Sequence, residues 1–173
     1  YDHLDLLALS IGADLVDITG ENRILAYHGM LNLREHMRPG IRAMLQVAGI
    51  EEAPKTVRDM SFSLGPRINA AGRVGHALTA AKLLMANDEG SALELASQLE
   101  TMNQARRDID EDLTEEAIAL MAEQPPGRSC TIVHGEGWHR GVLGIVASRL
   151  VEQRYCPTIV LSEENEVLTG SAR

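Results

Sequence analysis

Aromatic residues are scarce in this sequence. Tryptophan, tyrosine and phenylalanine make up 3% of its 173 residues, whereas apolar residues as a whole make up 45%. The chain therefore has enough apolar side chains to bury a core, and that core must be aliphatic. The length allows one domain or two small ones.

Long hydrophobic runs, targeting patterns and cysteine frameworks are also lacking. No apolar run approaches the roughly 20 residues of a membrane span, and we find no signal peptide. The two cysteines, Cys130 and Cys156, lack metal-ligand spacing, which favours reduced, buried thiols over a disulfide. We expect a cytoplasmic protein without a membrane partner. The sequence opens on Tyr1 and stops at Arg173, so we also expect a piece of a longer protein.

The net charge of −9 is unevenly distributed. Residues 88–123 carry eleven acidic and two basic residues, whereas the remainder of the chain is balanced and holds fourteen cations, most of them arginine. The planar guanidinium of arginine suits phosphate. The acidic total therefore does not exclude an anionic ligand.

The hydrophobic pattern predicts an α/β protein with two domains joined by an acidic helix. Helices are expected over residues 1–13, 21–37, 41–47 and 77–86, with a short one capped by Thr56. Residues 91–123 carry a thin apolar stripe typical of a connector helix. A strand at 131–133, a helix near 142–151, a strand at 158–161 and a final strand toward Arg173 follow.

A glycine-rich turn at residues 135–149 organises the second half of the chain. It lies between a strand and a helix, where unsatisfied helix N–H groups attract anions. Trp138, His139 and Arg140 stand in this turn and predict an anion site. The alternative is that Trp138 closes the core and His139 caps a helix.

A second glycine-rich stretch spans residues 65–75, and we expect a loop there. Arg67 and Arg73 could clamp a phosphate on this loop, with Asn69 adding an amide contact. The alternative is that the arginines cap helix ends or pair with carboxylates. If the two glycine-rich stretches face each other, they form a cleft.

Three further side chains fit the same chemistry. Asp14, near Asp17, offers a carboxylate to a hard cation such as Mg²⁺ or Mn²⁺, although helix capping is the ordinary role of such residues. Ser171 and Arg173 follow Gly170 and could complete an anion pocket, or they could form a solvated strand end. No P-loop, Ser-His-Asp arrangement or zinc pattern is present.

Four stretches in this order resemble RecJ-type single-stranded-DNA exonucleases of the DHH phosphoesterase family: residues 7–14, 64–73, 135–149 and 169–173. The resemblance implies a fold in which residues 1–87 are the C-terminal part of a DHH domain, residues 88–126 a connector helix and residues 127–173 a truncated DHHA1-type domain. It implies metal-dependent 5′-to-3′ hydrolysis of single-stranded DNA in repair and recombination, with Mn²⁺ or Mg²⁺ in a two-metal site.

The resemblance also assigns roles to residues. Asp14 matches the last metal-binding aspartate of the family. The residues that match substrate-binding motifs are Arg67, Asn69, Arg73, His139, Ser171 and Arg173. The family's upstream aspartates and its Asp-His-His triplet are absent, and Arg140 and Ala172 depart from its common residues. We therefore expect this segment alone to bind metal poorly and not to cleave DNA.

Two other functions stay open on the sequence. One is a DHH-family phosphodiesterase that acts on short oligonucleotides or cyclic dinucleotides, and the other is a non-catalytic scaffold with a nuclease-like fold. For a single-stranded DNA partner, the scarcity of aromatic residues predicts a grip on the sugar–phosphate backbone and little sequence preference. The oligomeric state is left open.

Overall fold

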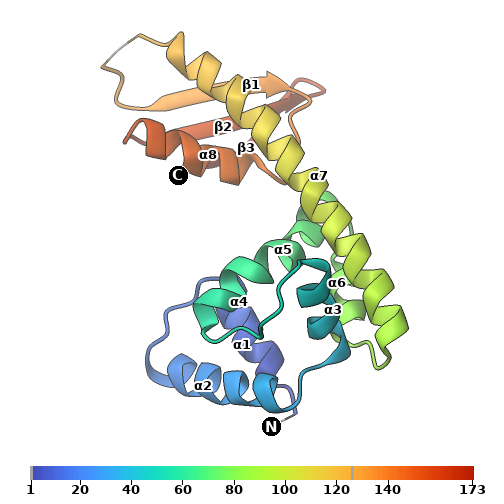
Figure 1. Cartoon of the computed structure of the whole chain (residues 1–173). Helices are drawn as coiled ribbons and strands as arrows, with labels where there is room; N and C mark the ends of the chain where they lie inside the picture. The colour runs from blue at the N-terminus through green and yellow to red at the C-terminus, as the bar shows by residue number, and fades with distance from the viewer. Residues whose placement is uncertain (1, 126) are drawn as a thin grey trace. The chain divides into compact units, whose positions relative to one another are not determined.

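The computed structural model describes residues 2–125 and 127–173 and has a mixed α/β fold, mostly helical with a small three-stranded sheet (Figure 1). The chain divides into two compact units, Tyr1–Gln104 and Ala105–Arg173. Each unit is described by itself. Among the described residues, no helix combines the length and apolarity that crossing a membrane requires.

The first unit is a cluster of helices around an aliphatic core. Its short helices are α1 (Leu4–Ala13), α2 (Gly20–Glu35), α3 (Pro39–Val47), α4 (Val57–Ser63), α5 (Gly65–Val74) and α6 (Ala77–Leu84). The largest fully buried side chains of this core belong to Leu33, Ile41, Met44, Met60, Leu64, Leu83 and Leu99. Among the residues that the structure describes, no aromatic one belongs to this core, which agrees with the composition.

The start of α4 follows the predicted cap. The Thr56 hydroxyl accepts a 3.1 Å hydrogen bond from the Asp59 N–H, and the Asp59 carboxylate accepts one of 2.9 Å from the Thr56 N–H. This reciprocal pair satisfies two helix N–H groups that would otherwise lack partners. The bond from the Thr56 backbone is the main reason that the pKa of Asp59 lies below its ordinary value.

The loop predicted over residues 65–75 is wrong, because the structure has helix α5 there. Pro66 stands in the first turn of the helix, where a missing N–H costs nothing. Ala70 and Ala71 are fully buried, and a Cβ on Gly65 would lie 3.3 Å from the Cα of Ala13. The buried positions here are mostly small, and Ile68 is the large apolar residue of α5 that packs against the core, so the stretch shows little of the pattern by which a buried helical face is normally recognised.

Helix α7 (Glu89–Ala122) runs without a break through 34 residues and contributes to two cores. Ala92, Ala96 and Leu99 pack in the core of the first unit, whereas Leu113 and Ala117 pack in that of the second. The thin apolar stripe predicted for this segment is thereby confirmed. Most of its other side chains are exposed and charged or polar.

The second unit combines the end of α7 with β1 (Thr131–Glu136), α8 (Leu143–Gln153), β2 (Thr158–Glu164) and β3 (Val167–Ala172). The strand order is β1-β2-β3, with β1 and β2 parallel and β2 and β3 antiparallel. Asn165 and Glu166 have φ values of 52° and 62°, as a tight two-residue hairpin requires. The predicted order of strand, turn, helix and strand is confirmed.

One face of this sheet is buried under helices. Val133 and Val160 point into a core formed with Val146 and Leu150 of α8 and Leu113 of α7. The cysteines lie near the starts of β1 and β2. Both are free and only partly buried, whereas the sequence favoured buried thiols.

Candidate functional site

The glycine-rich turn between β1 and α8 is anchored by its tryptophan. Trp138 is 6% exposed and packs in the core of the second unit. Its indole N–H donates a 3.0 Å hydrogen bond to Glu116 of α7. A Cβ on Gly135 would lie 2.2 Å from the indole ring, so only glycine leaves room for it. The structure therefore favours the core interpretation of Trp138 over a stacking platform.

His139 follows on the exposed side of the turn. Its Nδ1 accepts a 3.1 Å hydrogen bond from the Gly141 N–H, and its carbonyl accepts one of 3.1 Å from the Val142 N–H. Because Nδ1 acts as an acceptor, the neutral ring carries its proton on Nε2, which can donate to an anion. His139 thus holds the turn before α8, as the alternative interpretation suggested, whereas its contact with an anion stays a prediction.

Arg140 lies beside His139 and forms an ion pair with Glu164 of β2. The 2.7 Å contact is open to water, with side chains 53% and 59% exposed, so it stabilises the fold little. The guanidinium remains accessible at the surface.

Ser171 and Arg173 lie at the end of β3, against the first turn of α8. A Cβ on Gly144 would meet the Arg173 guanidinium at 2.9 Å and the Ser171 hydroxyl at 3.2 Å. Arg173 Nη1 also donates to the Ser171 hydroxyl over 3.3 Å and to the Ala172 carbonyl over 2.8 Å. The structure therefore brings this serine and arginine together at the end of a helix where N–H groups point outward.

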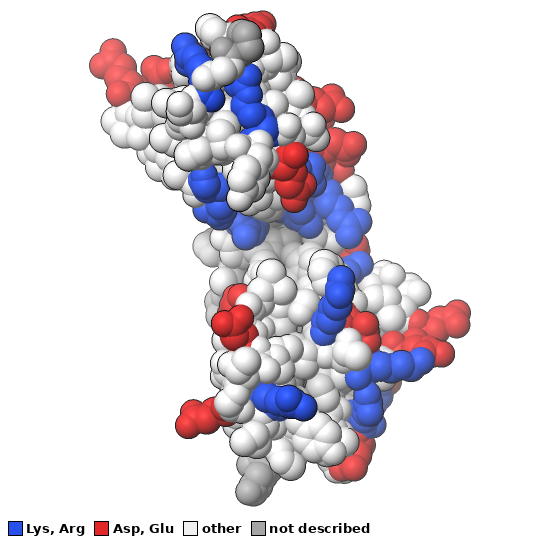
Figure 2. All heavy atoms as spheres, turned by 90° about the vertical axis from the view of Figure 1, so that its left-hand side faces the viewer, with Lys and Arg blue, Asp and Glu red and all other residues white. Residues whose placement is uncertain are grey.

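Positive side chains lie at the surface of the second unit. Figure 2 draws one face of the molecule, and on the part of it that belongs to the second unit several Lys and Arg side chains lie among acidic ones. The five arginines beyond residue 123 are matched by five glutamates. An anion here would therefore be held by individual placed donors and less by a broad positive field.

Asn69 contacts the end of α1 in the first unit, where Asp14 lies. Asp14 is the C-terminal cap residue of α1 and is exposed. The Asn69 amide of α5 donates a 3.4 Å hydrogen bond to the carbonyl of Ala13, the residue before it. Packing of α5 on α1 thus places Asn69 against the residue that precedes Asp14.

Arg67 and Arg73 do not form the predicted two-armed clamp. Six residues apart on an α-helix, their side chains point about 120° apart around its axis. Arg67 is 11% exposed, forms an ion pair with Glu100 of α7 and donates to the Ser63 carbonyl over 2.5 Å. Arg67 therefore pairs with a carboxylate, as the alternative interpretation predicted, whereas Arg73 lies exposed in the last turn of α5.

The metal-ligand set is incomplete. Within residues 2–125 and 127–173, no three His, Cys, Asp or Glu side chains come close enough to hold a metal ion. Asp14 offers one carboxylate and belongs to no such group of three among these residues. The donors of this chain alone do not fit a one-metal or a two-metal centre.

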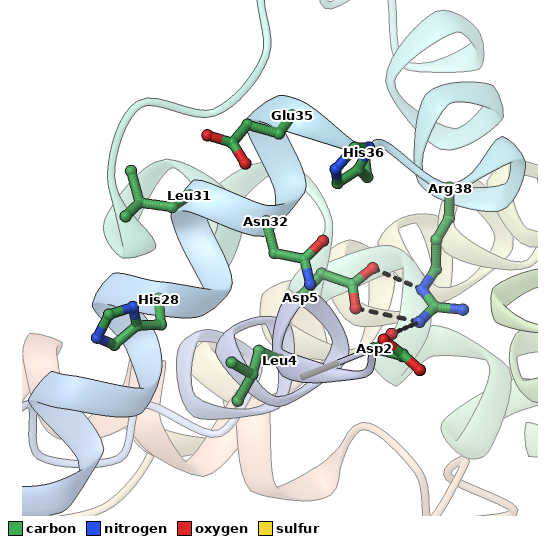
Figure 3. A pocket seen from close by; sticks show the side chains of 9 residues that line it. All are labelled: Asp2, Leu4, Asp5, His28, Leu31, Asn32, Glu35, His36 and Arg38. Carbon is green, nitrogen blue, oxygen red and sulfur yellow. Dashed lines mark hydrogen bonds and ion pairs between the residues drawn. The ribbon is translucent and has the colours of Figure 1, made fainter.

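A pocket of about 530 Å³ opens elsewhere in the first unit, and Figure 3 shows its lining. At its edge Arg38 Nε lies 2.5 Å from one oxygen of the buried Asp5 carboxylate, and Nη2 lies 3.2 Å from the other. This two-pronged pair ties the start of α1 to the start of α3. The lining of the pocket includes none of the predicted site residues, and we assign it a structural role.

Sequence reasoning missed two residues that shape the site. Gly144 allows Ser171 and Arg173 to approach α8, and Glu116 holds the indole of Trp138. Glu116 is one of many acidic residues on α7, and its partner lies 22 residues away. Nothing in the local pattern singles it out.

Comparison with known proteins gives relatives of one kind. The chain is 41% identical to the single-stranded-DNA-specific exonuclease RecJ of Haemophilus influenzae, in an alignment of 181 positions that covers 99% of this chain and 31% of that protein. It is 38% identical to RecJ of Bacillus subtilis over 98% of this chain and 22% of that protein. The chain thus spans less than a third of either relative. No family model matches it.

The fold gives the same result. A crystal structure of RecJ in complex with Mg²⁺ from Thermus thermophilus superposes with a TM-score of 0.83 at 28% identity, over 93% of this chain and 25% of that one. A crystal structure of the same protein in complex with Mn²⁺ also gives 0.83. Over nearly its whole length the chain therefore matches one part of RecJ exonucleases in sequence and in fold, which confirms the resemblance predicted from its four motifs.

Proposed function

We propose that this chain is part of a metal-dependent exonuclease that hydrolyses single-stranded DNA from the 5′ end. The observation that carries the proposal is the 41% identity, over 99% of the chain, to a protein named as a single-stranded-DNA-specific exonuclease. Because the chain covers 31% of that relative, the activity belongs to the longer protein. We infer a role in DNA repair and recombination and, from the two free cysteines, a cytoplasmic location.

The domain layout that we propose is residues 1–87 as the C-terminal part of a DHH domain, residues 88–126 as a connector helix and residues 127–173 as part of a DHHA1-type domain. The helical first unit, the unbroken helix α7 and the small sheet of the second unit support this division. It places the predicted metal ligand and the predicted substrate-gripping turn in different domains.

We assign Asp14 as one ligand of a Mn²⁺ or Mg²⁺ site, because both ions prefer oxygen ligands. The relatives whose structures were determined with Mg²⁺ or Mn²⁺ support this choice of metal. Bound metals would supply the activated water and the polarised phosphoryl group. The remaining ligands must lie outside this chain, so we assign no step of the hydrolysis to its residues. Asn69 holds the end of the helix on which Asp14 stands.

The second domain is proposed to grip the DNA backbone. His139 offers its Nε2 proton, Ser171 its hydroxyl and Arg173 its guanidinium, all near the N-terminal turn of α8. In the first domain, Arg73 offers a separate exposed cation, and Arg67 can bind DNA only by leaving Glu100. Such donors recognise phosphate and not base edges, which predicts cleavage with little sequence preference.

The test is a nuclease assay on the full-length protein, with single-stranded and duplex DNA labelled at either end. We expect Mn²⁺- or Mg²⁺-dependent release of label from the 5′ end of the single strand, lost on chelation. Asp14→Ala should abolish it, whereas Asp17→Ala, three residues away in the same exposed segment, should retain it. Cleavage confined to short oligonucleotides or cyclic dinucleotides would favour the phosphodiesterase alternative, and DNA binding without cleavage would favour the scaffold.

A further inference from the structure

The indole of Trp138 is held from two sides. On one side lies Gly135, where a Cβ would clash with the ring, and at the ring edge the indole N–H donates to the carboxylate of Glu116. Gly135 fixes how closely the ring can approach β1, whereas the hydrogen bond fixes the direction of the ring edge. Two such constraints leave the ring a single orientation.

The backbone carries this orientation to His139, the next residue. Gly137, with φ of 70°, donates its N–H to the Glu163 carbonyl of β2 over 3.1 Å and holds the turn on its near side. On the far side, His139 accepts from the N–H groups of Gly141 and Val142. A change of the Trp138 ring that shifts its backbone would therefore displace the imidazole and the start of α8 together.

We propose that Glu116 is a positioning residue for substrate binding, which acts through Trp138 to set the place of His139. The inference rests on the proposed phosphate-binding role of His139. Glu116 does not touch the substrate in this account. It links the connector helix α7 to the turn that grips the DNA.

The exposure of Glu116 distinguishes a positioning role from a role in the stability of the fold. Its side chain lies at the surface, so without the indole its carboxylate is solvated at little cost. The fold is held by the apolar burial of the ring, which replacement of Glu116 leaves in place. We therefore expect substitution of Glu116 to disturb DNA binding more than stability.

Four single variants of the full-length protein and one double variant, Glu116→Ala with Trp138→Phe, test the proposal, and His139→Ala tests the role on which it rests. Glu116→Ala removes the acceptor, and Glu116→Gln keeps a neutral one. Trp138→Phe keeps a ring without its N–H. Glu115→Ala removes a neighbouring exposed charge of α7 and serves as the matched control. The measurements are KM and kcat on single-stranded DNA, thermal unfolding, and the indole ¹H–¹⁵N signal of Trp138, assigned by its loss in Trp138→Phe.

We expect Glu116→Ala to raise KM roughly two- to tenfold and to leave kcat unchanged, because the weakened contact is made equally in the ground state and in the transition state. The indole signal should shift in this variant. Glu116→Gln and Glu115→Ala should stay close to wild type. Trp138→Phe should raise KM as Glu116→Ala does, and the double variant should add nothing further, because both single changes break the same bond.

Three results would overturn the inference. The first is an unchanged KM in Glu116→Ala. The second is an equal rise of KM in Glu116→Gln, which would point to the charge of Glu116 alone. The third is a parallel fall of kcat and melting temperature in Glu116→Ala, which would point to a structural role. The variant His139→Ala distinguishes a failure of this inference from a failure of the proposed function. If it leaves KM unchanged, the phosphate role of His139 fails and the inference falls with it. If it raises KM while Glu116→Ala does not, the inference alone fails.

Discussion

Arg149 of α8 donates a 2.7 Å hydrogen bond to the carboxylate of Asp110 in α7. Asp110 is fully buried. Arg106, one turn earlier on α7, approaches the same oxygen at 3.5 Å. A buried carboxylate is costly unless it is paired, so loss of this contact should weaken the packing of α7 and α8 that their apolar side chains provide.

Replacement of Arg149 by alanine should therefore destabilise the protein by about 1.5–3 kcal/mol, the usual range for a hydrogen bond to a charged group. Arg140→Ala is the matched control, because it breaks an ion pair of the same length that is open to water, and it should cost less than about 1 kcal/mol. Chemical unfolding of both variants measures the difference. Equal losses would contradict the role given to burial.

Gly144→Ala should weaken DNA binding without harming the fold. The added Cβ would push aside the ends of the Arg173 and Ser171 side chains, which can move, while alanine favours the helix. We expect lower affinity of the full-length protein for single-stranded DNA and a salt slope smaller by about 0.7 for each lost phosphate contact.

Gly72→Ala controls for helix propensity, because a Cβ there meets open space. It should stabilise α5 by up to about 1 kcal/mol and leave DNA binding unchanged. An unaltered affinity in Gly144→Ala would mean that Ser171 and Arg173 do not hold the DNA in the positions described.

The two arginines of α5 should respond differently to alanine. Arg67→Ala removes a largely buried guanidinium from Glu100 and from the Ser63 carbonyl, so the first unit should lose about 1–3 kcal/mol. Arg73→Ala removes an exposed side chain, so stability should change by less than about 1 kcal/mol while the salt slope of DNA binding falls by about 0.7. A salt slope that responds to Arg67→Ala at unchanged stability would give Arg67 the substrate role as well.

The capping box of α4 gives the first unit a pH-dependent component of stability. The folded-state pKa of Asp59 is lowered, chiefly by the Thr56 N–H, so its carboxylate stabilises the fold above the unfolded-state value of about 4. That contribution is lost as pH falls through the lowered folded-state value. Asp59→Asn should flatten this part of the acid-unfolding curve, and Thr56→Ala should cost about 1 kcal/mol at neutral pH. An acid-unfolding curve of Asp59→Asn that matches wild type would refute the assignment.

Much of the fold follows from local patterns. The Thr56 cap, the apolar stripe of α7 and the strand–turn–helix–strand order of the second unit depend on periodicity and on turn chemistry, which neighbouring residues determine. The stretch at residues 65–75 was predicted wrongly because Gly65 serves close contact with α1 and Ala70 and Ala71 are buried in a helix, so these small residues do not mark a chain reversal. A pattern of small residues does not distinguish the two uses.

The site was less predictable than the fold. Family motifs pointed to Asp14, His139, Ser171 and Arg173, and the structure places Ser171 beside Arg173 at α8. The pairing of Arg67 with Glu100 and of Trp138 with Glu116 joins residues 33 and 22 positions apart. Only tertiary packing selects such partners from a helix rich in glutamate.

The acidic segment that contains α7 has a kinetic consequence. With eleven acidic and two basic residues over 88–123, it repels an approaching polyanion, whereas the balanced remainder of the chain does not. Long-range electrostatics then disfavour the approach of a DNA strand to α7 relative to its approach to the remainder of the chain, before any hydrogen bond forms. The association rate should therefore respond to ionic strength in two opposing ways, as salt screens the attraction to arginine and the repulsion from α7 alike.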